Sequence, residues 1–568
     1  MRNLTLNKMS AILLFLMAQK VSADLGVASA ASSFQCPDWV SQRNNLPVCP
    51  PSGIVPEINP IAALVVSDQG YIGAGSGYED AGRDSGFTSD VVIKALTGAG
   101  DKLPMIILPA ESATYSRIIS DIDSLKISEE KKRKFKRSIL HVPLKQGFTW
   151  QQDYMQSAVD PKTGQLQFRE VESYRRLKSR NSENQFAAIS EALKKCGVAS
   201  GPSLKPAISE PDRAKREVMR GGEMGGNIEA LPGGICVLGD DHFKGQEWEE
   251  YSKEACPNTP KDKIVKAPTF WLNVGHSDEI MKVVRNKGKK EPCNFTVTIA
   301  SPKKALELLR QSPNEVFADF SNSNVQSQSV RTKRRFEQAD ALITLCDRTR
   351  EIRRLQREAP PKNQPGPAPS GGGKTVSQMY HPLLQILIGE ANAGVELVST
   401  VDTNTAQVKE TIDCEKITNG EVARVISEDP ELRDYNNEIQ KQMDMLKNDV
   451  YAKLKSAMPP TCNPEIIEVP NLFYGGSVVT DDNGNKSLPN QLGNSFLPNP
   501  TNAISINNTI ISPDPGNAAF KRYLEAEYKK RGQNPQFVDT FDYAHQGYGN
   551  LHCSTNTLHI CKPLGVGR

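Results

Sequence analysis

The hydrophobic and polar positions of this chain change their period repeatedly. A period of two residues is typical of a strand with one buried face, and a period of 3.6 is typical of an amphipathic helix. Residues 105–109 form a short apolar run, which predicts a buried strand, and residues 295–299 alternate, which predicts a half-buried strand. The changes of period therefore predict an α/β fold.

Two segments predict a strand that leads directly into a helix. After the strand at 295–299, Ser301 and Pro302 supply an N-cap and a first-turn proline, both of which favour a helix start. Further along, residues 504–511 predict a strand, and a helix with one apolar face follows and ends at Gly532. Residues 537–541 predict the next strand.

One long amphipathic helix is the clearest local signal. Its apolar residues recur every three or four positions up to Pro459 and Pro460, and they are Leu432, Tyr435, Ile439, Met443, Leu446, Val450 and Leu454. We expect this stripe to lie in the core. Residues 359–373, in contrast, have almost no apolar side chain to bury and predict a Pro/Gly-rich linker.

The N-terminus has the pattern of a secretory signal peptide. Arg2 and Lys8 are followed by an apolar run at 9–18 and by Val21-Ser22-Ala23, which matches a cleavage site. The run is too short to cross a hydrocarbon core of roughly 30 Å as a helix. We therefore expect residues 1–23 to be a signal peptide, with no transmembrane span and a secreted or periplasmic protein. An uncleaved anchor is the alternative, and a cytoplasmic location is the less favoured one.

Composition and charge narrow the class of protein. The 568 residues include 69 basic and 66 acidic side chains, a net charge of only +3, so no nucleic-acid partner is expected. With 38% hydrophobic and 24% charged residues, the chain has the composition of a soluble globular protein. Collagenous, wholly disordered and multispanning membrane proteins are excluded.

The 11 cysteines bear on both folding and chemistry. In an exported chain disulfides are expected, and an odd number leaves at least one thiol unpaired within the monomer. Cys36 and Cys49 are a candidate pair, and Cys553 and Cys561 are another. A zinc cluster at 552–561 is disfavoured, because the spacing of its His and Cys residues fits none of the usual patterns.

Four short segments place polar groups in strand-like or glycine-rich surroundings. They are residues 149–153, 225–229, 271–279 and 547–556. Paired glycines in the second segment allow the backbone to approach a ligand closely. In the third, residues two apart on an extended chain share a face, which would place His276 beside Asp278.

Taken together, these segments resemble the catalytic domain of the protein-arginine deiminases, in the guanidine-modifying superfamily. Trp150-Gln151-Gln152-Asp153 resembles the family's Trp-x-Gln-Asp, and residues 271–279 resemble its Trp-Leu-x-Val-Gly-His-x-Asp-Glu. Residues 552–556 resemble its terminal His-Cys-Gly-Thr-Asn. The fold that this resemblance implies is a five-bladed α/β propeller, built from pseudo-fivefold ββαβ modules around a central site.

The resemblance also divides the chain. Residues 24–104 are expected to form an N-terminal lead-in and the start of the catalytic fold, and residues 105–568 the catalytic domain. An insertion at about 347–425 would interrupt that domain and contain the linker at 359–373.

The implied chemistry is the hydrolysis of a guanidinium, a delocalised cation that is a poor electrophile. The resemblance assigns Asp153 and Asp278 to hold this cation, because carboxylates pair bidentately with planar N–H donors. It assigns Cys553 to attack as a thiolate, and His276 to transfer protons. If Cys553 stays reduced, an even number of cysteines remains to pair.

The resemblance indicates the substrate-binding residues less directly than the catalytic ones. Trp150 is expected to form an apolar wall beside the substrate's methylene chain, and Gly226 and Asn227 to let the backbone contact it. Calcium-dependent members carry an arginine shortly before the nucleophile, where this chain has Gly547. Arg213 is a candidate for the equivalent contact, and so is Arg220.

Calcium is the cofactor that the resemblance suggests, because some members of the family depend on it. Gln152 and Glu229 match metal-ligand positions of the family, but Tyr154 and Gln156 stand where calcium-dependent members have acidic residues. Calcium prefers six to eight oxygen ligands. We therefore expect the chemistry to require no cofactor, with calcium at Gln152 and Glu229 as the alternative.

The resulting hypothesis is a hydrolase that converts peptidyl-arginine, in proteins or peptides, to peptidyl-citrulline and ammonia through a Cys-linked thiouronium. Three alternatives remain open. They are a deiminase of agmatine or free arginine, an amidinotransferase, and a non-catalytic binding protein on the same fold.

Overall fold

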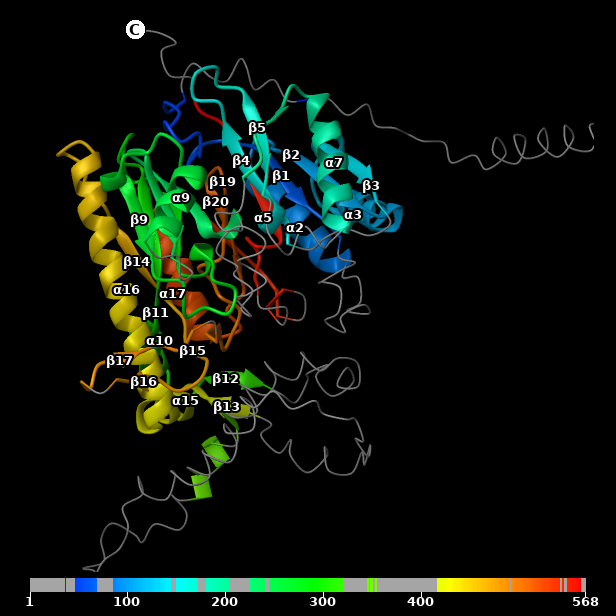
Figure 1. Cartoon of the computed structure of the whole chain (residues 1–568). Helices are drawn as coiled ribbons and strands as arrows, with labels where there is room; N and C mark the ends of the chain where they lie inside the picture. The colour runs from blue at the N-terminus through cyan, green and yellow to red at the C-terminus, as the bar shows by residue number, and fades with distance from the viewer. Residues whose placement is uncertain are drawn as a thin grey trace, which may run out of the picture.

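The computed structural model describes residues 36, 46–68, 85–144, 150–171, 180–204, 225–240, 245–319, 345–346, 348–350, 353–354, 416–481, 483–490, 492–541, 544–545 and 549–562. Helices and strands alternate along these residues, which confirms the mixed α/β class (Figure 1). The predicted signal peptide, the linker at 359–373, and Arg213 and Arg220 lie outside the described residues. Among those residues, no helix has the length and apolar character needed to cross a membrane.

Five sheets within the described residues repeat one pattern of pairing. In each, two antiparallel strands are followed by a helix and by a strand parallel to the second of them. Four of these modules are β4 (Met155–Val159), β5 (Leu166–Glu170), α7 (Arg180–Lys194) and β6 (Ala199–Ser200); β7 (Ile228–Leu231), β8 (Ile235–Gly239), α9 (Gln246–Ala255) and β9 (Ile264–Ala267); β10 (Met281–Arg285), β11 (Phe295–Ser301), α10 (Pro302–Gln311) and β14 (Ile466–Pro470); and β19 (Ile504–Ile506), β20 (Thr509–Pro513), α17 (Ala518–Lys530) and β21 (Asn534–Val538). The closure of the modules into a propeller stays a prediction.

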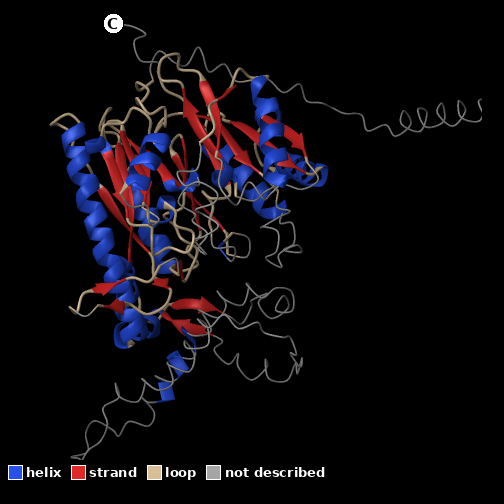
Figure 2. Ribbon diagram, viewed as in Figure 1, coloured by secondary structure: helices blue, strands red, loops and turns tan. Residues whose placement is uncertain are grey.

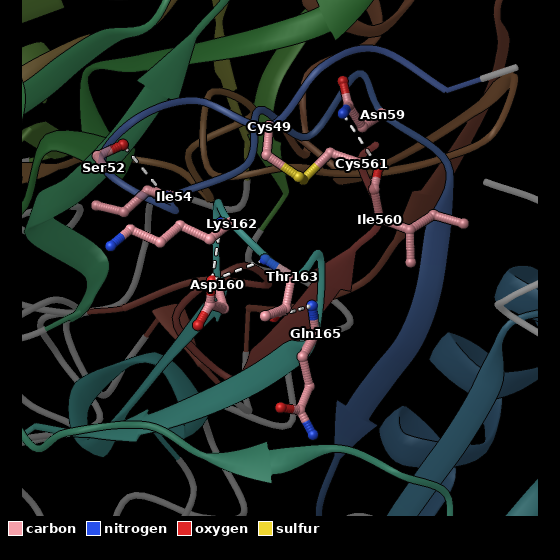
Figure 3. Close-up of a disulfide and its surroundings, with 10 residues drawn as sticks. All are labelled: Cys49, Ser52, Ile54, Asn59, Asp160, Lys162, Thr163, Gln165, Ile560 and Cys561. Carbon is pink, nitrogen blue, oxygen red and sulfur yellow. Dashed lines mark hydrogen bonds between the residues drawn. A yellow bond between two sulfur atoms is a disulfide. The ribbon is translucent and has the colours of Figure 1, made fainter. Parts of the chain in front are cut away.

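The fifth module joins the two ends of the chain. Its strands and helix are β22 (Thr555–His559), β1 (Ile61–Val66), α2 (Ser85–Gly98), β2 (Met105–Ala110) and an added parallel strand β3 (Ile139–Pro143). Cys49 forms a disulfide with Cys561, and Asn59 Nδ2 donates a hydrogen bond to the Ile560 carbonyl at 3.1 Å (Figure 3). The residues just after β22 are therefore held against the segment that precedes β1.

Three helices predicted from local sequence patterns are present in the structure. Helix α10 has Ser301 as its N-cap, and helix α17 ends before Gly532, whose φ is 69°. The long helix α16 (Pro430–Ala457) runs along one side of the molecule (Figure 1), and all seven residues of its predicted stripe are buried. Six of them pack in a core that includes Trp271 and Phe295, and Leu432 packs in a second core.

Three strand predictions need correction. Residues 295–299 are buried on both faces, because β11 lies between β10 and β14 and its polar residues Thr296 and Thr298 are covered. Residues 504–511 form the hairpin of β19 and β20, which turns at Asn507 with φ 54°. The following strand begins at Asn534, three residues earlier than predicted.

Figure 2 distinguishes helices from strands in the same view as Figure 1. The remaining elements connect strands and helices within and between these modules. They are α3 (Ser112–Ser124), α4 (Glu129–Arg137), α5 (Gln151–Tyr154), η2 (Gly225–Asn227), η3 (Lys261–Lys263), η4 (Ser277–Glu279), β12 (Val316–Asp319), β13 (Lys416–Thr418), α15 (Asn419–Glu428), β15 (Phe473–Tyr474), β16 (Val479–Thr480), β17 (Lys486–Ser487) and β18 (Asn494–Ser495). Strand β13 and the first part of helix α15 fall within the predicted insertion at 347–425, most of which lies outside the described residues.

The disulfides pair cysteines that are distant in sequence. The bonds are Cys36–Cys196, Cys49–Cys561, Cys236–Cys256 and Cys293–Cys462, and Cys346 is also disulfide-bonded. The predicted pairs Cys36–Cys49 and Cys553–Cys561 are both wrong, because the pairing of β1 with β22 brings Cys49 to Cys561. Within the described part of the chain, Cys553 is the free cysteine.

We expect the bond between Cys49 and Cys561, which spans 512 residues, to stabilise the fold by restricting the unfolded chain. Replacing both cysteines by alanine should lower the free energy of unfolding by about 2–5 kcal/mol. Scanning calorimetry of the double variant measures this effect as a lower melting temperature. A matched double variant at Cys236 and Cys256, which close a span of 20 residues, should lose less. An equal loss in the two variants would contradict the expectation.

Candidate active site

The segments that precede the first strand of each module meet at one place. The segments before β4 and β22 are joined by the Gln152 amide, which donates to the Cys553 carbonyl at 3.2 Å. The Ser277 amide, before β10, donates to Asn227 Oδ1, before β7, at 3.0 Å. The His552 amide donates to Asn502 Oδ1, before β19, at 2.7 Å. The repeated topology thus gathers residues from five distant parts of the sequence.

The free thiol of Cys553 lies at the centre of this cluster and is buried. Its Sγ is 3.4 Å from Glu279 Oε1 and 3.6 Å from Asp278 Oδ2, and Asn502 Nδ2 donates to it at 3.3 Å. Burial, together with the charges of Asp278, Glu279 and Asp153, raises the pKa of the thiol well above its ordinary value. The thiol is therefore protonated at neutral pH.

His276 and Asp278 share this centre with Cys553. One ligating atom from each of the three lies within 4.8 Å of the other two, a set of N, O and S donors that could also hold a metal ion. Residues 277–279 form the 3₁₀ turn η4, so the predicted extended geometry is wrong although the two side chains do meet. A Cβ on Gly226 would lie 2.7 Å from His276 Nδ1, so only glycine fits there.

Asp153 is the second predicted carboxylate, and it is buried on the single helical turn α5. Its charge is one of those that raise the pKa of the Cys553 thiol. The structure therefore brings together all four predicted catalytic residues, namely Asp153, His276, Asp278 and Cys553.

Behind Asp278 lies a buried network that the sequence did not reveal. His552 Nδ1 donates to Asp278 Oδ2 at 2.6 Å, and its Nε2 lies 2.8 Å from Glu57 Oε1. Lys282 Nζ donates to Glu57 Oε1 at 2.8 Å and to Glu229 Oε1 at 2.9 Å. We define these five residues, Glu57, Glu229, Asp278, Lys282 and His552, as the buried charge network.

The network shifts the pKa values of its members. Burial and the Lys282 ammonium oppose protonation of His552, but Glu57 and Asp278 outweigh them and raise its pKa to about 9. Burial would raise the pKa of Asp278, yet its hydrogen bond from His552 and the nearby cations lower it below the usual range. Burial and the charge of Asp278 raise the pKa of Glu279 to about 8. At neutral pH the site thus holds an ionised Asp278 beside a protonated Glu279 and a protonated His552.

These shifts predict a loss of stability as pH rises. The pKa of Glu279 is about 8 instead of 4.5, so the folded state keeps a proton that the unfolded chain releases between these values. The stabilisation from His552 is complete below its ordinary pKa of 6.5 and is lost as pH rises through about 9. We expect the melting temperature to fall between pH 6 and 9, and to fall less in Glu279→Gln.

Differential scanning fluorimetry over this pH range measures the effect. Glu525→Gln, at an exposed glutamate that pairs with Lys529, is the matched control and should follow the wild-type curve. Parallel curves for Glu279→Gln and wild type would contradict the expectation.

The predicted substrate residues have different surroundings. Trp150 is buried, and a Cβ on Gly549 would lie 2.5 Å from its ring, which brings the tryptophan against the segment that carries Cys553. Asn227 uses its amide within the protein, because Nδ2 donates to the Gly239 carbonyl at 3.1 Å and Oδ1 accepts from Ser277. Asn227 therefore positions η4 and does not present its amide for a substrate.

The oxygen atoms near Gln152 and Glu229 do not fit a calcium ion. Glu229 already accepts from the Lys282 ammonium, and Gln152 Oε1 accepts from Asn556 Nδ2 at 2.5 Å. A calcium ion beside Glu229 would lie next to the buried Lys282 ammonium, and the repulsion between the two cations opposes its binding. No step of the chemistry below depends on calcium.

The sequence analysis assigned no role in the site to four residues that the structure places there. They are Glu57, Lys282, Glu279 and Asn502. Lys282 alternates with Met281 and Val283 in β10, a pattern that predicts an exposed lysine. Glu57 lies in the segment interpreted as a lead-in. Neither residue carried a local signal, whereas Glu279 and His552 were already contained in the quoted motifs.

Comparisons with known proteins agree with the resemblance in the C-terminal part of the chain. Residues 379–562 match the protein-arginine deiminase (PAD) family, and this range contains His552 and Cys553. No curated protein is similar in sequence. The match supports a hydrolase that deiminates guanidino groups, and it does not distinguish peptidyl-arginine from a small guanidine.

Two solved structures are similar to the chain at low identity. The agmatine deiminase of C. jejuni is 9% identical over 90% of this chain and 96% of that chain, with a TM-score of 0.40. The agmatine deiminase of Enterococcus faecalis is 9% identical over 90% of this chain and 98% of that chain, with a TM-score of 0.39.

Proposed function

Because residues 379–562 match the protein-arginine deiminase family, we propose that the protein hydrolyses peptidyl-arginine to peptidyl-citrulline and ammonia, with Cys553 as the nucleophile. The observation that carries this proposal is the position of the one free cysteine in the described residues. Cys553 lies between acidic side chains and near His276, in a buried site.

In the proposed mechanism, substrate binding and thiol activation are coupled. The carboxylates of Asp153 and Asp278 attract the guanidinium and orient it by bidentate hydrogen bonds. The bound cation offsets the negative charges that hold the pKa of Cys553 high, and so favours the thiolate. The nucleophile is thus formed mainly when its target is in place.

The chemical steps conserve atoms and protons. The thiolate attacks the guanidinium carbon, and the resulting tetrahedral adduct expels ammonia after His276 donates a proton to the leaving nitrogen. This leaves a positively charged S-alkyl thiouronium on Cys553. His276 then takes a proton from water, and the hydroxide attacks the same carbon. The carbon–sulfur bond breaks to release the thiolate, and the hydroxyl proton of the adduct passes to solvent, which leaves the neutral ureido product.

The fold and location of the protein belong to the same proposal. Five modules of like topology support a five-bladed arrangement with these residues at its centre. The disulfides support a secreted or periplasmic protein, because such bonds persist in oxidising compartments.

The test is product analysis with three substrates: an arginine peptide blocked at both ends, agmatine and free arginine. Ammonia release should be fastest from the peptide, with a mass gain of the peptide that corresponds to replacement of NH by O. Turnover of agmatine or free arginine alone would assign a small-guanidine deiminase. Absence of product from all three would favour a binding protein.

A further inference from the structure

The interior of the active-site region contains a lysine that the mechanism does not use. Lys282 is 1% exposed, and it projects from β10 into the buried charge network. Transfer of an ammonium from water to a protein interior costs several kcal/mol unless charges and hydrogen bonds compensate. The carboxylates of Glu57 and Glu229 provide this compensation.

A short chain of contacts connects this ammonium to the reacting sulfur. Lys282 Nζ lies 2.6 Å from His552 Nε2, and both nitrogens contact the same oxygen of Glu57 at 2.8 Å. His552 Nδ1 forms a hydrogen bond with Asp278 Oδ2 at 2.6 Å, and this oxygen lies 3.6 Å from Cys553 Sγ. Displacement of Glu57 or His552 would therefore displace the carboxylate that faces the nucleophile.

The charges around Lys282 resemble those around a metal ion. Two carboxylates, Glu57 and Glu229, converge on one cationic centre in the interior, and Gln152 Nε2 lies 2.9 Å from His552 at the same place. Without the ammonium, the two carboxylates would face each other across a buried gap with no cation between them. Such a pair either takes up protons or binds a cation from solution.

We infer that Lys282 is a positioning residue that acts as a built-in cation, occupying the place that a divalent metal would take between Glu57 and Glu229. Through Glu57 and His552 it fixes Asp278, and it makes the site independent of divalent metals. The effect on turnover rests on the proposed deiminase function, whereas the occupation of the site by an ammonium does not.

The variant Lys282→Ala tests this assignment, because it removes the ammonium and leaves both carboxylates. Calcium chloride titrated by calorimetry into the full-length variant should reveal one binding site that wild type lacks. In the ammonia assay, kcat should fall by about 10–100-fold with little change in KM, as for other residues that orient a catalytic group. Addition of calcium should restore at least part of that kcat.

Lys447→Ala is the matched control, since it also leaves a carboxylate, that of Glu468, without its lysine but lies outside the site. It should bind no additional calcium and keep wild-type turnover. Wild-type activity that is lost in EDTA and restored by calcium would overturn the inference. So would a Lys282→Ala variant that binds no extra calcium and turns over like Lys447→Ala.

If Lys282→Ala does not fold, the charge-balanced variant Lys282→Met/Glu229→Gln replaces it. This variant should show a reduced kcat, an altered pH profile and no calcium binding, and unchanged kcat and pH profile would overturn the inference. If wild type releases ammonia from none of the guanidines, the proposed function fails. Calorimetry then still decides whether Lys282 holds a cation site.

Discussion

Cys553→Ala is expected to abolish deimination, with a fall in kcat of at least about 10⁴-fold on any guanidine that the wild type hydrolyses. The described structure offers no second free thiol at the site, and alanine removes only the sulfur atom that must bond to the guanidinium carbon. The fold should survive, because Sγ makes one hydrogen bond from Asn502 and otherwise faces carboxyl groups that oppose its ionisation. Ammonia release and the melting temperature are the two measurements.

The matched control for Cys553→Ala is the substitution Ser554→Ala at the next residue. Ser554 is buried beside Cys553, and its Oγ donates to the Asn550 and Leu551 carbonyls, away from the thiol. Ser554→Ala should keep most of the activity. Wild-type protein should also gain the mass of a haloacetamidine adduct that Cys553→Ala does not gain. Substantial activity in Cys553→Ala would remove the proposed nucleophile.

Asp278→Asn is expected to lower kcat/KM by about 10³-fold, because it removes a charged acceptor from a buried site. The amide cannot balance the guanidinium charge, and it weakens the contact with His552. The same substitution should make the free thiol more reactive, since the charge of Asp278 is one cause of the raised pKa of Cys553. Turnover and thiol reactivity should therefore change in opposite directions.

Two measurements test this pair of effects. The first is kcat/KM in the ammonia assay, and the second is the rate at which neutral iodoacetamide alkylates Cys553 in the absence of substrate. Asp240→Asn is the control, since this carboxylate accepts from the Thr269 and Phe270 amides at 3.0 Å, outside the cluster around Cys553. A fall in both rates for Asp278→Asn would indicate a general loss of structure and contradict the electrostatic explanation.

The parts of the fold that could be predicted from sequence are those whose signal is local. The repeated apolar stripe predicts helix α16, and the N-cap Ser301 with Pro302 predicts the start of helix α10. The hairpin of β19 and β20 gave no such signal, because its turn uses Asn507 and contains no glycine or proline. The pairing of Cys49 with Cys561 depends on strands from opposite ends of the chain, so no local pattern could predict it.

The sequence alone indicates which residues the proposed site contains: Cys553, His276, Asp153 and Asp278 stand in segments that resemble family motifs in the same order. Only the tertiary structure decided how these groups are charged. Protonation depends on burial and on distances of a few ångströms to groups such as Glu57 and Lys282, which come from other parts of the chain. The sequence can thus name the groups of the proposed site, while their pKa values are a property of the folded interior.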